Sequence, residues 1–267
     1  MFTPHLIEAN NPGPMTGRGN NTYLIIGSTG TAALIDAGVG EPRHLAALAR
    51  ELEGSRAHLD DVLVTHAHAD HAGGAPSLAA AHPRAGFRKF PWPDEDNQYH
   101  VRWEPLGDHD RLHVGGEEII VLHTPGHSPD HLAFWHPPSA TVFTGDLVVR
   151  GSSVMIESSR GGDLTQYLAS LERILALEPR QLLPAHGDVI TDPAPLLTQY
   201  LAHRRAREAQ VLAALAAGRD SVQAIADYIY DGLAPALRPA AEENVRAHLH
   251  KLEAEGRAFE TNDRWKL

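Results

Sequence analysis

A ten-residue stretch that begins at position 65, THAHADHAGG, holds four potential metal ligands within six positions. They are His66, His68, Asp70 and His71. Imidazole is the most common metal ligand in proteins, and alternate side chains of an extended segment point to the same side, so His66 and His68 can approach one ion together. The turn that follows directs Asp70 and His71 to a neighbouring position. The spacing therefore predicts a metal centre.

Three later segments each place one more potential ligand directly after a predicted strand. The segments are TPGH, FTGD and PAHG, and they contain His127, Asp146 and His186. Strands that end in glycine-containing turns bearing His or Asp are what a site at one edge of packed sheets requires. The four segments together predict one site with room for two metal ions.

The elements that must position these ligands lie between Asn20 and Asp192, where short apolar runs alternate with Gly/Pro turns. Two stretches, 42–52 and 163–177, carry leucines three and four positions apart and are predicted to be helices, the second with Asp163 as its N-cap. A further short helix is expected at 76–81. The runs predicted to be strands are 22–26, 32–35, 61–65, 118–122, 132–135, 141–143 and 181–183. Strands mixed with helices indicate the α/β or α+β class.

A change of pattern after the Pro-rich stretch at 192–195 indicates a second unit. Helical patterns cover 196–217, 222–230 and 240–255, and the last residues form a predicted hairpin, 257–261 with 264–267. Three helices followed by a small hairpin are typical of a winged helix. We therefore expect a metal-binding domain at 1–195 and a winged-helix-like domain at 196–267, short enough that it packs against the first.

Composition limits the classes of function. The chain has 267 residues, or roughly 1.8 domains at about 150 residues each, and 18 of them are histidines. It has no cysteine, which excludes disulfides, thiolate nucleophiles and Cys-ligated zinc. The net charge of -11 argues against an extended grip on nucleic acid. Because no targeting segment or membrane-spanning run is visible, we expect a cytoplasmic protein with no membrane partner.

The ligand motifs, in this order, resemble the metallo-β-lactamase superfamily. The resemblance covers almost the whole chain and implies an α+β fold, the four-layer αβ/βα sandwich, with two Zn²⁺ ions at one edge of the sheets. It implies that one ion is held by His66, His68 and His127. It implies that the second is held by Asp70, His71 and His186, with Asp146 bridging both. Other divalent metals suit the same ligands.

A finer resemblance is to the β-lactamase-like protein 2 group. It rests on the opening segment at 11–26, on the segment TPGHSPDH, and on the helical tail with His203, Arg204 and Arg205. That group carries a winged-helix-like domain after the hydrolase domain. Its relatives include single-stranded RNA endonucleases and acyl-carrier thioesterases.

The resemblance implies hydrolysis by a metal-bound hydroxide, because zinc can lower the pKa of water to about 7. Asp70 is the expected catalytic residue, orienting the hydroxide and passing its proton to the leaving group. Asp36, in the segment LIDAG, is expected to fix the ligand loop. His131 either faces the substrate or begins the next strand.

Several alternatives remain open at this stage. The substrate is an ester-like acyl bond (ester, thioester or lactone), small or carrier-bound, or a short single-stranded RNA, and the acidic charge favours the acyl bond. A groove of Arg84, Arg88, Lys89 and the cluster at 204–207 would favour RNA. An iron-dependent oxidoreductase of the same fold is a second hypothesis, and a winged-helix DNA-binding regulator a third. The segment at 83–117 is expected to be a long insertion whose aromatic residues anchor a loop or line the substrate mouth. These are Trp92, Tyr99 and Trp103, with His100 beside them.

Overall fold

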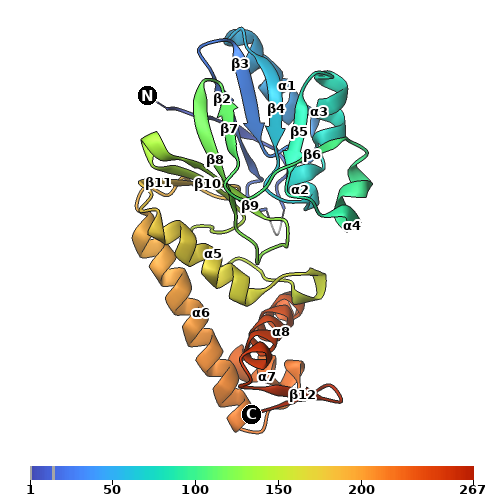
Figure 1. Ribbon diagram of the computed structural model, residues 1–267. Helices are drawn as coiled ribbons and strands as arrows, with labels where there is room; N and C mark the ends of the chain where they lie inside the picture. Colours follow the sequence, from blue (N-terminus) through green and yellow to red (C-terminus); the bar gives the residue numbers. More distant parts are fainter. Residues whose placement is uncertain (1, 14–15) are drawn as a thin grey trace.

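The computed structural model describes residues 2–13 and 16–267. Met1, in the segment searched for a targeting signal, lies outside the described residues. So do Pro14 and Met15, which belong to the 11–26 segment of the group resemblance. Figure 1 shows two sheets stacked face to face at one end of the molecule and a helical part at the other, joined by the long helix α6 (Pro193–Ala216).

The first sheet has six strands in sequence order. The first three are antiparallel neighbours, and from the third strand on the pairing is parallel. The carboxyl ends of the parallel strands therefore meet at one edge, from which the ligand loop leaves. The strands are β1 (His5–Glu8), β2 (Asn21–Ile26), β3 (Thr31–Ile35), β4 (His58–Leu63), β5 (Gly86–Lys89) and β6 (Trp103–Pro105).

The second sheet has five strands in the order β11-β10-β9-β8-β7. Only β10 and β11 run parallel, and the other pairs are antiparallel. The strands are β7 (Arg111–Val114), β8 (Glu117–His123), β9 (Leu132–His136), β10 (Thr141–Gly145) and β11 (Gln181–Pro184).

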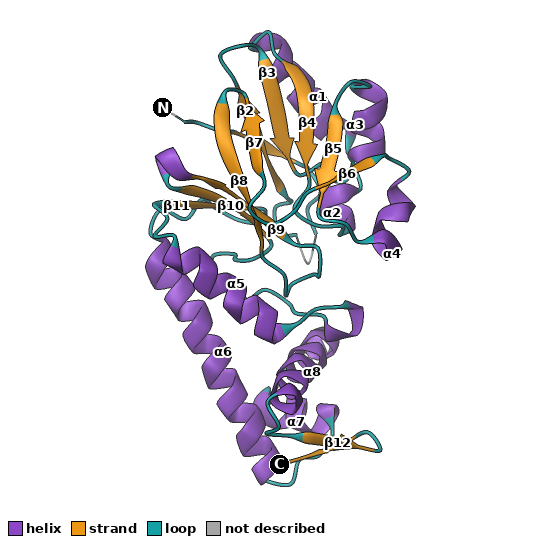
Figure 2. Cartoon of the chain, viewed as in Figure 1, coloured by secondary structure: helices purple, strands orange, loops and turns teal. Residues whose placement is uncertain are grey.

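Helices cover the outer face of each sheet, which gives four layers (Figure 2). On the first sheet, α1 (Pro42–Gly54) and α3 (Ala75–Ala81) bury Leu48 and Leu78 in one apolar cluster with the outward side chains of β3 and β4. On the second sheet, α5 (Leu164–Ala176) does the same. The inward side chains of both sheets form the central core, which includes Tyr23, Ile35, Leu63, Ile119, Phe134 and Phe143. The arrangement is the one that the resemblance implies.

Short and half-exposed strands were missing from the sequence prediction. Four strands, β1, β5, β6 and β7, are three or four residues long, and each of them buries at most alternate side chains. Such strands carry no continuous apolar run that a sequence pattern could reveal. The segment at 83–117 is therefore not a long loop: it contains β5, β6 and β7 with the short helix α4 (Pro93–Asp96) and a 3₁₀ turn at Asn97–Tyr99. The strand expected at 61–65 ends at Leu63, so the ligand segment is irregular from residue 64.

The C-terminal part consists of α6, α7 (Val222–Ile229), α8 (Arg238–Ala254) and the hairpin β12 (Phe259–Thr261) and β13 (Arg264–Lys266). It has its own core, which includes Val211, Ile225, Val245, Leu249 and Trp265. The first half of α6 instead lies against α5, and its Leu197, Tyr200 and Leu201 belong to the apolar cluster on the outer side of the second sheet. The domain division after residue 195 stays a prediction, and it falls within the first turn of α6.

Four short elements complete the described chain: the helix α2 (Ala69–Ala72) and the 3₁₀ turns Pro137–Ser139, Ser158–Arg160 and Pro235–Leu237, the last directly before α8. Of the helices in the described residues, none combines the length and apolar content that crossing a bilayer requires.

Candidate metal centre

The seven predicted ligands come from four loops at one edge of the stacked sheets. His66, His68, Asp70 and His71 follow β4, and the last two stand in α2. The remaining three lie just beyond the ends of β8, β10 and β11. They are His127, Asp146 and His186. The structure brings all seven together in two adjacent groups, and their role as ligands stays a prediction.

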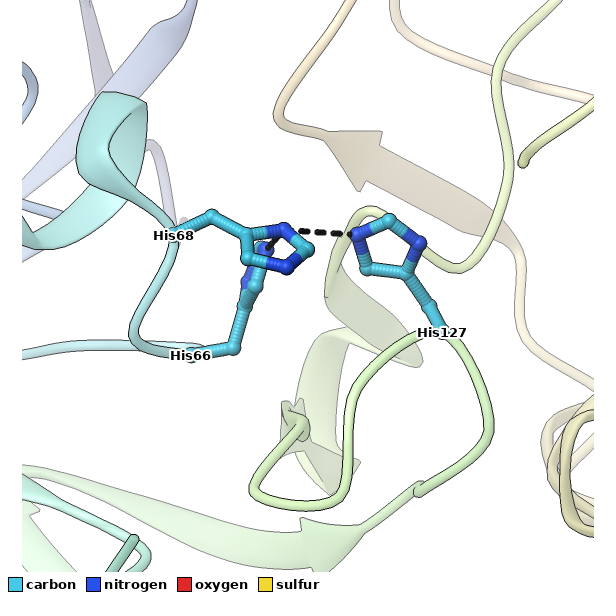
Figure 3. Close-up of side chains that lie close together, drawn as sticks. All are labelled: His66, His68 and His127. Carbon is cyan, nitrogen blue, oxygen red and sulfur yellow. Dashed lines mark hydrogen bonds between the residues drawn. The ribbon is translucent and has the colours of Figure 1, made fainter. Parts of the chain in front are cut away.

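The first group is formed by three imidazoles (Figure 3). Nε2 of His66 lies 2.9 Å from Nδ1 of His68, and Nε2 of His127 lies 3.1 Å from the same atom. His66 is fully buried, whereas His68 and His127 reach the surface of a cavity. Three ring nitrogens thus converge on one point.

The second group contains Asp70, His71, Asp146 and His186. Nε2 of His186 lies 3.2 Å from Asp146 Oδ1 and 3.5 Å from Asp70 Oδ2. Asp146 Oδ2 lies 3.4 Å from His71 Nε2 and 3.6 Å from His127 Nε2 of the first group. Asp146 is therefore the residue that stands between the two groups.

Contacts behind the ligands fix which ring nitrogen faces the centre. The Met155 carbonyl lies 2.9 Å from Nδ1 of His127, so this nitrogen carries the proton and Nε2 presents a lone pair. Asp36 Oδ2 lies 2.8 Å from Nδ1 of His71 and has the same effect. Asp36 also accepts the Thr65 amide at 2.8 Å, which ties the start of the ligand segment to β3. Such outer contacts are typical of metal-binding histidines.

Both backbone polar groups of Ala67, between the two histidines of the HxH pattern, are held by side chains distant in sequence. Its N–H donates to Asp130 Oδ2 at 2.8 Å, and its carbonyl accepts the Tyr99 hydroxyl at 2.5 Å. Lys89, which is completely buried, pairs with Asp130 at 2.9 Å and with Asp96 at 2.5 Å. No sequence pattern indicated that Asp130 and Lys89 hold the ligand segment. Tyr99 is buried and anchors the ligand loop, and it does not line the cavity.

His131 does not face the substrate side. Its ring is fully buried, and Nε2 accepts the backbone N–H of Asp146 at 3.1 Å. Gly145, at φ 48°, makes this approach possible, because a Cβ at that position would lie 2.7 Å from the same nitrogen. His131 therefore positions the Asp146 backbone.

The electrostatics of the two groups differ. Burial and the neighbouring imidazole of His127 lower the pKa of His68 to about 3, and burial with the imidazole of His71 also lowers the pKa of His66, so both of these rings are neutral. In the second group, burial opposes ionisation, but His71 and His186 hold the pKa of Asp146 well below its usual range. Burial also opposes the charged form of His186, yet the contacts with Asp146 and Asp70 raise its pKa to about 9.

The donor set fits two divalent cations. In the first group, ring nitrogens of three imidazoles face one another at close range, an arrangement that a shared cation stabilises. In the second group, two carboxylates and two imidazoles offer the mixed nitrogen and oxygen ligands that zinc and iron accept. Asp146 Oδ1 is buried and has no hydrogen-bond partner of suitable geometry within the described residues, as expected for an atom that binds a metal ion.

A cavity of about 850 Å³ opens directly onto both groups, and His68, Asp70, Asp146 and His186 form part of its wall. Its outer rim is apolar at three points contributed by different parts of the chain. Leu6 of β1, Val189 after β11 and Leu237 before α8 all line it, and all three are exposed. Arg18 and Arg160 also line the cavity, and each pairs with a neighbouring carboxylate, Asp188 or Glu157.

The basic residues considered for an RNA groove lie in different environments. Lys89 is fully buried, and Arg204 is 1% exposed. Arg88 pairs with Asp61 and Glu104 at 2.8 and 3.3 Å. The cluster at 204–207 is also divided, because Arg205 faces solvent beside Glu172 while Arg207 packs over the Tyr230 ring at 4.2 Å. The three arginines at 204–207, although neighbours in the sequence, thus lie in three different environments.

Comparison with known proteins agrees with this geometry. Residues 15–186 match the family described as the Metallo-beta-lactamase superfamily, and residues 221–265 match the Beta-lactamase associated winged helix domain. A Beta-lactamase-like protein 2 homolog from Drosophila melanogaster is 34% identical over 259 residues, covering 92% of this chain and 86% of that protein. An Atrochrysone carboxyl ACP thioesterase from Aspergillus novofumigatus is 35% identical over 80% of this chain, which spans 64% of that relative.

Two solved structures are also similar. A metallo-beta-lactamase family protein from Thermus thermophilus superposes with a TM-score of 0.81, covering 98% of both chains at 22% identity. The protein TTHA1623, solved in a di-iron-bound form, gives 0.58 at 32% identity over 74% of this chain and 98% of its own. These matches confirm the fold that the motifs implied. The chain belongs to the metallo-β-lactamase superfamily of metal-dependent hydrolases and carries the winged-helix domain associated with it.

Proposed function

We propose that this chain is a dinuclear zinc hydrolase that cleaves an ester-like acyl bond, an ester, thioester or lactone. The observation that carries the proposal is the pair of ligand groups on the floor of one cavity, with Asp146 between them. In this proposal the first group holds one ion, Asp70, His71 and His186 hold the other, and Asp146 bridges both. Two such ions, when bound, would activate a water molecule and polarise the carbonyl of the substrate.

Asp70 is the residue that we assign to proton movement. It lines the cavity, and its Oδ2 accepts a hydrogen bond from Asn20 Nδ2 at 3.1 Å. Burial opposes its ionisation, but His71 and His186 hold the pKa of Asp70 below its usual range, so it is ionised and can accept a hydrogen bond from a water molecule. Its place at the cavity wall lets it orient the attacking water and pass the proton to the leaving group.

Three observations support an acyl substrate over RNA. The cavity rim has three exposed apolar side chains, which suit an apolar acyl group better than a phosphodiester backbone. Two of the basic residues considered for an RNA groove, Lys89 and Arg204, are buried. The printed name of the Aspergillus novofumigatus relative is that of an acyl-carrier thioesterase.

Iron is the alternative metal, because the similar protein TTHA1623 was solved with two iron atoms. The donor set includes imidazoles and carboxylates, which both metals accept. The absence of cysteine removes the soft ligand that would favour zinc strongly. We therefore propose zinc from the hydrolytic chemistry, and metal analysis of purified protein decides between zinc and iron.

The test is a parallel screen of a thioester, a lactone and a labelled single-stranded RNA with zinc-loaded protein. We expect hydrolysis of the thioester or the lactone, loss of that activity on chelation, and its return when zinc is added back. Cleavage of RNA without acyl hydrolysis would overturn the substrate assignment. Purified protein that holds only a single iron, and that gains no activity from zinc, would overturn the dinuclear zinc assignment.

A further inference from the structure

The cavity wall between β10 and α5 is an irregular segment that other elements hold in place. Residues 147–157 contain no helix or strand, although they contribute more of the wall than any single strand does. Backbone of this kind keeps its shape only where its polar groups find partners elsewhere. The residues of this segment that line the cavity are Val148, Val149, Ser152, Ser153, Val154, Met155 and Glu157.

Helix α6 supplies those partners at the first half of the segment. The Tyr200 hydroxyl lies 3.0 Å from the Val149 amide nitrogen, from which it accepts a hydrogen bond. It lies 2.7 and 2.9 Å from the carbonyl oxygens of Val149 and Ser152, to which it can donate. One side chain of α6 therefore closes the turn at 149–152.

Arg204, one turn further along α6, holds the second half. Its guanidinium is 1% exposed and donates through Nη2 to the Val154 carbonyl. Through Nη1 it donates to Asn244 Oδ1 of α8 at 2.7 Å. The same guanidinium stands 5.3 Å over the Tyr167 ring, and the Tyr167 hydroxyl donates to the Leu147 carbonyl at 2.8 Å. Within the described residues no carboxylate lies within ion-pair distance of Arg204. Its charge is stabilised by the Val154 carbonyl, the Asn244 amide oxygen and the Tyr167 ring.

These contacts lead directly to the metal centre. Val154 precedes Met155, and the Met155 carbonyl is the group that fixes the tautomer of His127 at 2.9 Å. Leu147 follows Asp146, the residue between the two ligand groups. A shift of Arg204 would therefore move the backbone at Val154, next to the Met155 carbonyl that orients His127. Through the Tyr167 ring it would also disturb Leu147, which follows Asp146.

We propose that Arg204 is a positioning residue through which the winged-helix domain holds the metal centre, with Asn244 of α8 as its contact in that domain. The proposal assigns the C-terminal domain a role in shaping the hydrolase site, whatever else the domain binds. It rests on the proposed function only in taking His127 for a metal ligand. The contacts between Arg204, Val154 and Asn244 are independent of that assignment.

The test compares Arg204→Met and Asn244→Ala with Arg207→Met. The control removes an arginine of the same helix that packs over the Tyr230 ring, and within the described residues no hydrogen bond or ion pair joins it to the 147–157 segment. Hydrogen exchange is measured on the metal-free protein at residues 147–156, and zinc affinity is measured by competition with a chelator. We expect exchange at 153–156 to become at least tenfold faster in both test variants, and zinc affinity to fall about tenfold, the usual effect of losing an outer partner. The control should match the wild type in both.

Steady-state kinetics separate positioning from general loss of structure. For the substrate found in the screen, we expect kcat to fall in Arg204→Met while the melting temperature of Arg207→Met shifts with no loss of kcat. If Arg204→Met does not fold, Asn244→Ala carries the test, because it keeps the buried guanidinium and removes only the link to α8. Exchange and zinc affinity that stay at wild-type values in Asn244→Ala and in any folded Arg204→Met would overturn the proposal. If no hydrolysis is found, exchange and metal affinity still decide it, so its failure is distinct from failure of the proposed function.

Discussion

The His127 imidazole offers one nitrogen to the Met155 carbonyl and the other to His68, and this division of roles recurs among the histidines of the chain. His71 divides its nitrogens between Asp36 and the second ligand group. Both ring nitrogens of His131 form hydrogen bonds with protein groups, the Thr124 hydroxyl and the Asp146 amide, so neither is free to bind a metal. The partner of each ring nitrogen, more than its exposure, distinguishes a candidate ligand from a structural histidine.

Removal of a single candidate ligand tests whether hydrolysis depends on the metal. We expect His66→Ala or Asp146→Ala to abolish hydrolysis while the protein stays folded, because each removes a donor atom from a group that is assembled by loops. Circular dichroism and metal content by elemental analysis provide the measurements, with His58→Ala, an exposed histidine, as the control. Full activity in a variant that has lost its metal would refute the metal-dependent mechanism.

A second prediction concerns His248. It is completely buried in α8, and neither ring nitrogen has a hydrogen-bond partner within the described residues. Burial and the neighbouring Arg204 and Arg207 lower its pKa to about 3 in the folded chain. Below about pH 6.5 the unfolded chain therefore binds a proton at this residue that the folded chain does not bind. The free energy of unfolding consequently falls as the pH falls.

The His248→Leu variant removes this dependence. Relative to the variant, the wild type should lose about 2 kcal/mol of unfolding free energy between pH 7 and pH 5, the work of excluding that proton over 1.5 pH units. Urea titrations of both proteins at the two pH values measure the difference. Equal pH slopes in the two proteins would show that the pKa of His248 is the same in the folded and the unfolded chain.

At the element scale, the ligand loop depends on residues of the segment that follows β5. The Tyr99 hydroxyl donates to the Ala67 carbonyl, and no other described group bonds this oxygen. Tyr99→Phe should leave the carbonyl buried and unpaired, at a cost of about 1–3 kcal/mol of unfolding free energy. It should also weaken zinc binding, since Ala67 separates two ligands.

Chemical denaturation and chelator competition test this prediction, with Tyr228→Phe as the matched control, because Tyr228 is half-exposed and distant from the ligand loop in the chain. A variant that loses stability but keeps its zinc affinity would show that Tyr99 supports the fold and leaves the ligand loop unchanged.

Sequence patterns predicted the elements whose signal is local. The buried strands β2 and β3, and the helices with leucines at helical spacing, were visible because each has a continuous apolar stripe. The HxHxDH segment was visible because four ligands stand within six positions. The partners of Ala67 were not visible, because Asp130 and Tyr99 lie 63 and 32 residues away from it. Arg204 was read as part of a basic cluster, and only the packing of α5, α6 and α8 shows that it is buried.

In the whole molecule, the long helix α6 connects the two parts of the chain (Figure 1). At one end, helix α6 joins α5 in the apolar cluster outside the second sheet, and at the other end it contributes to the C-terminal core. Leu237, which precedes α8, lines the same cavity as the candidate metal ligands. The C-terminal part therefore contributes to the site in two ways, by holding its wall and by completing its rim.

Leu237 allows the second contribution to be tested separately from the first. Its side chain is 54% exposed, so Leu237→Ser should change the unfolding free energy by no more than about 0.5 kcal/mol. For a substrate with a long apolar acyl group we expect KM to rise about three- to tenfold with kcat unchanged, because the lost contact is with a part of the substrate that does not react. A short acetyl substrate should show no change, and Leu267→Ser, at an equally exposed leucine outside the cavity wall, should match the wild type with both. An equal rise in KM for the short substrate would mean that the variant disturbs the site as a whole, and no rise for the long one would place the acyl group elsewhere in the cavity.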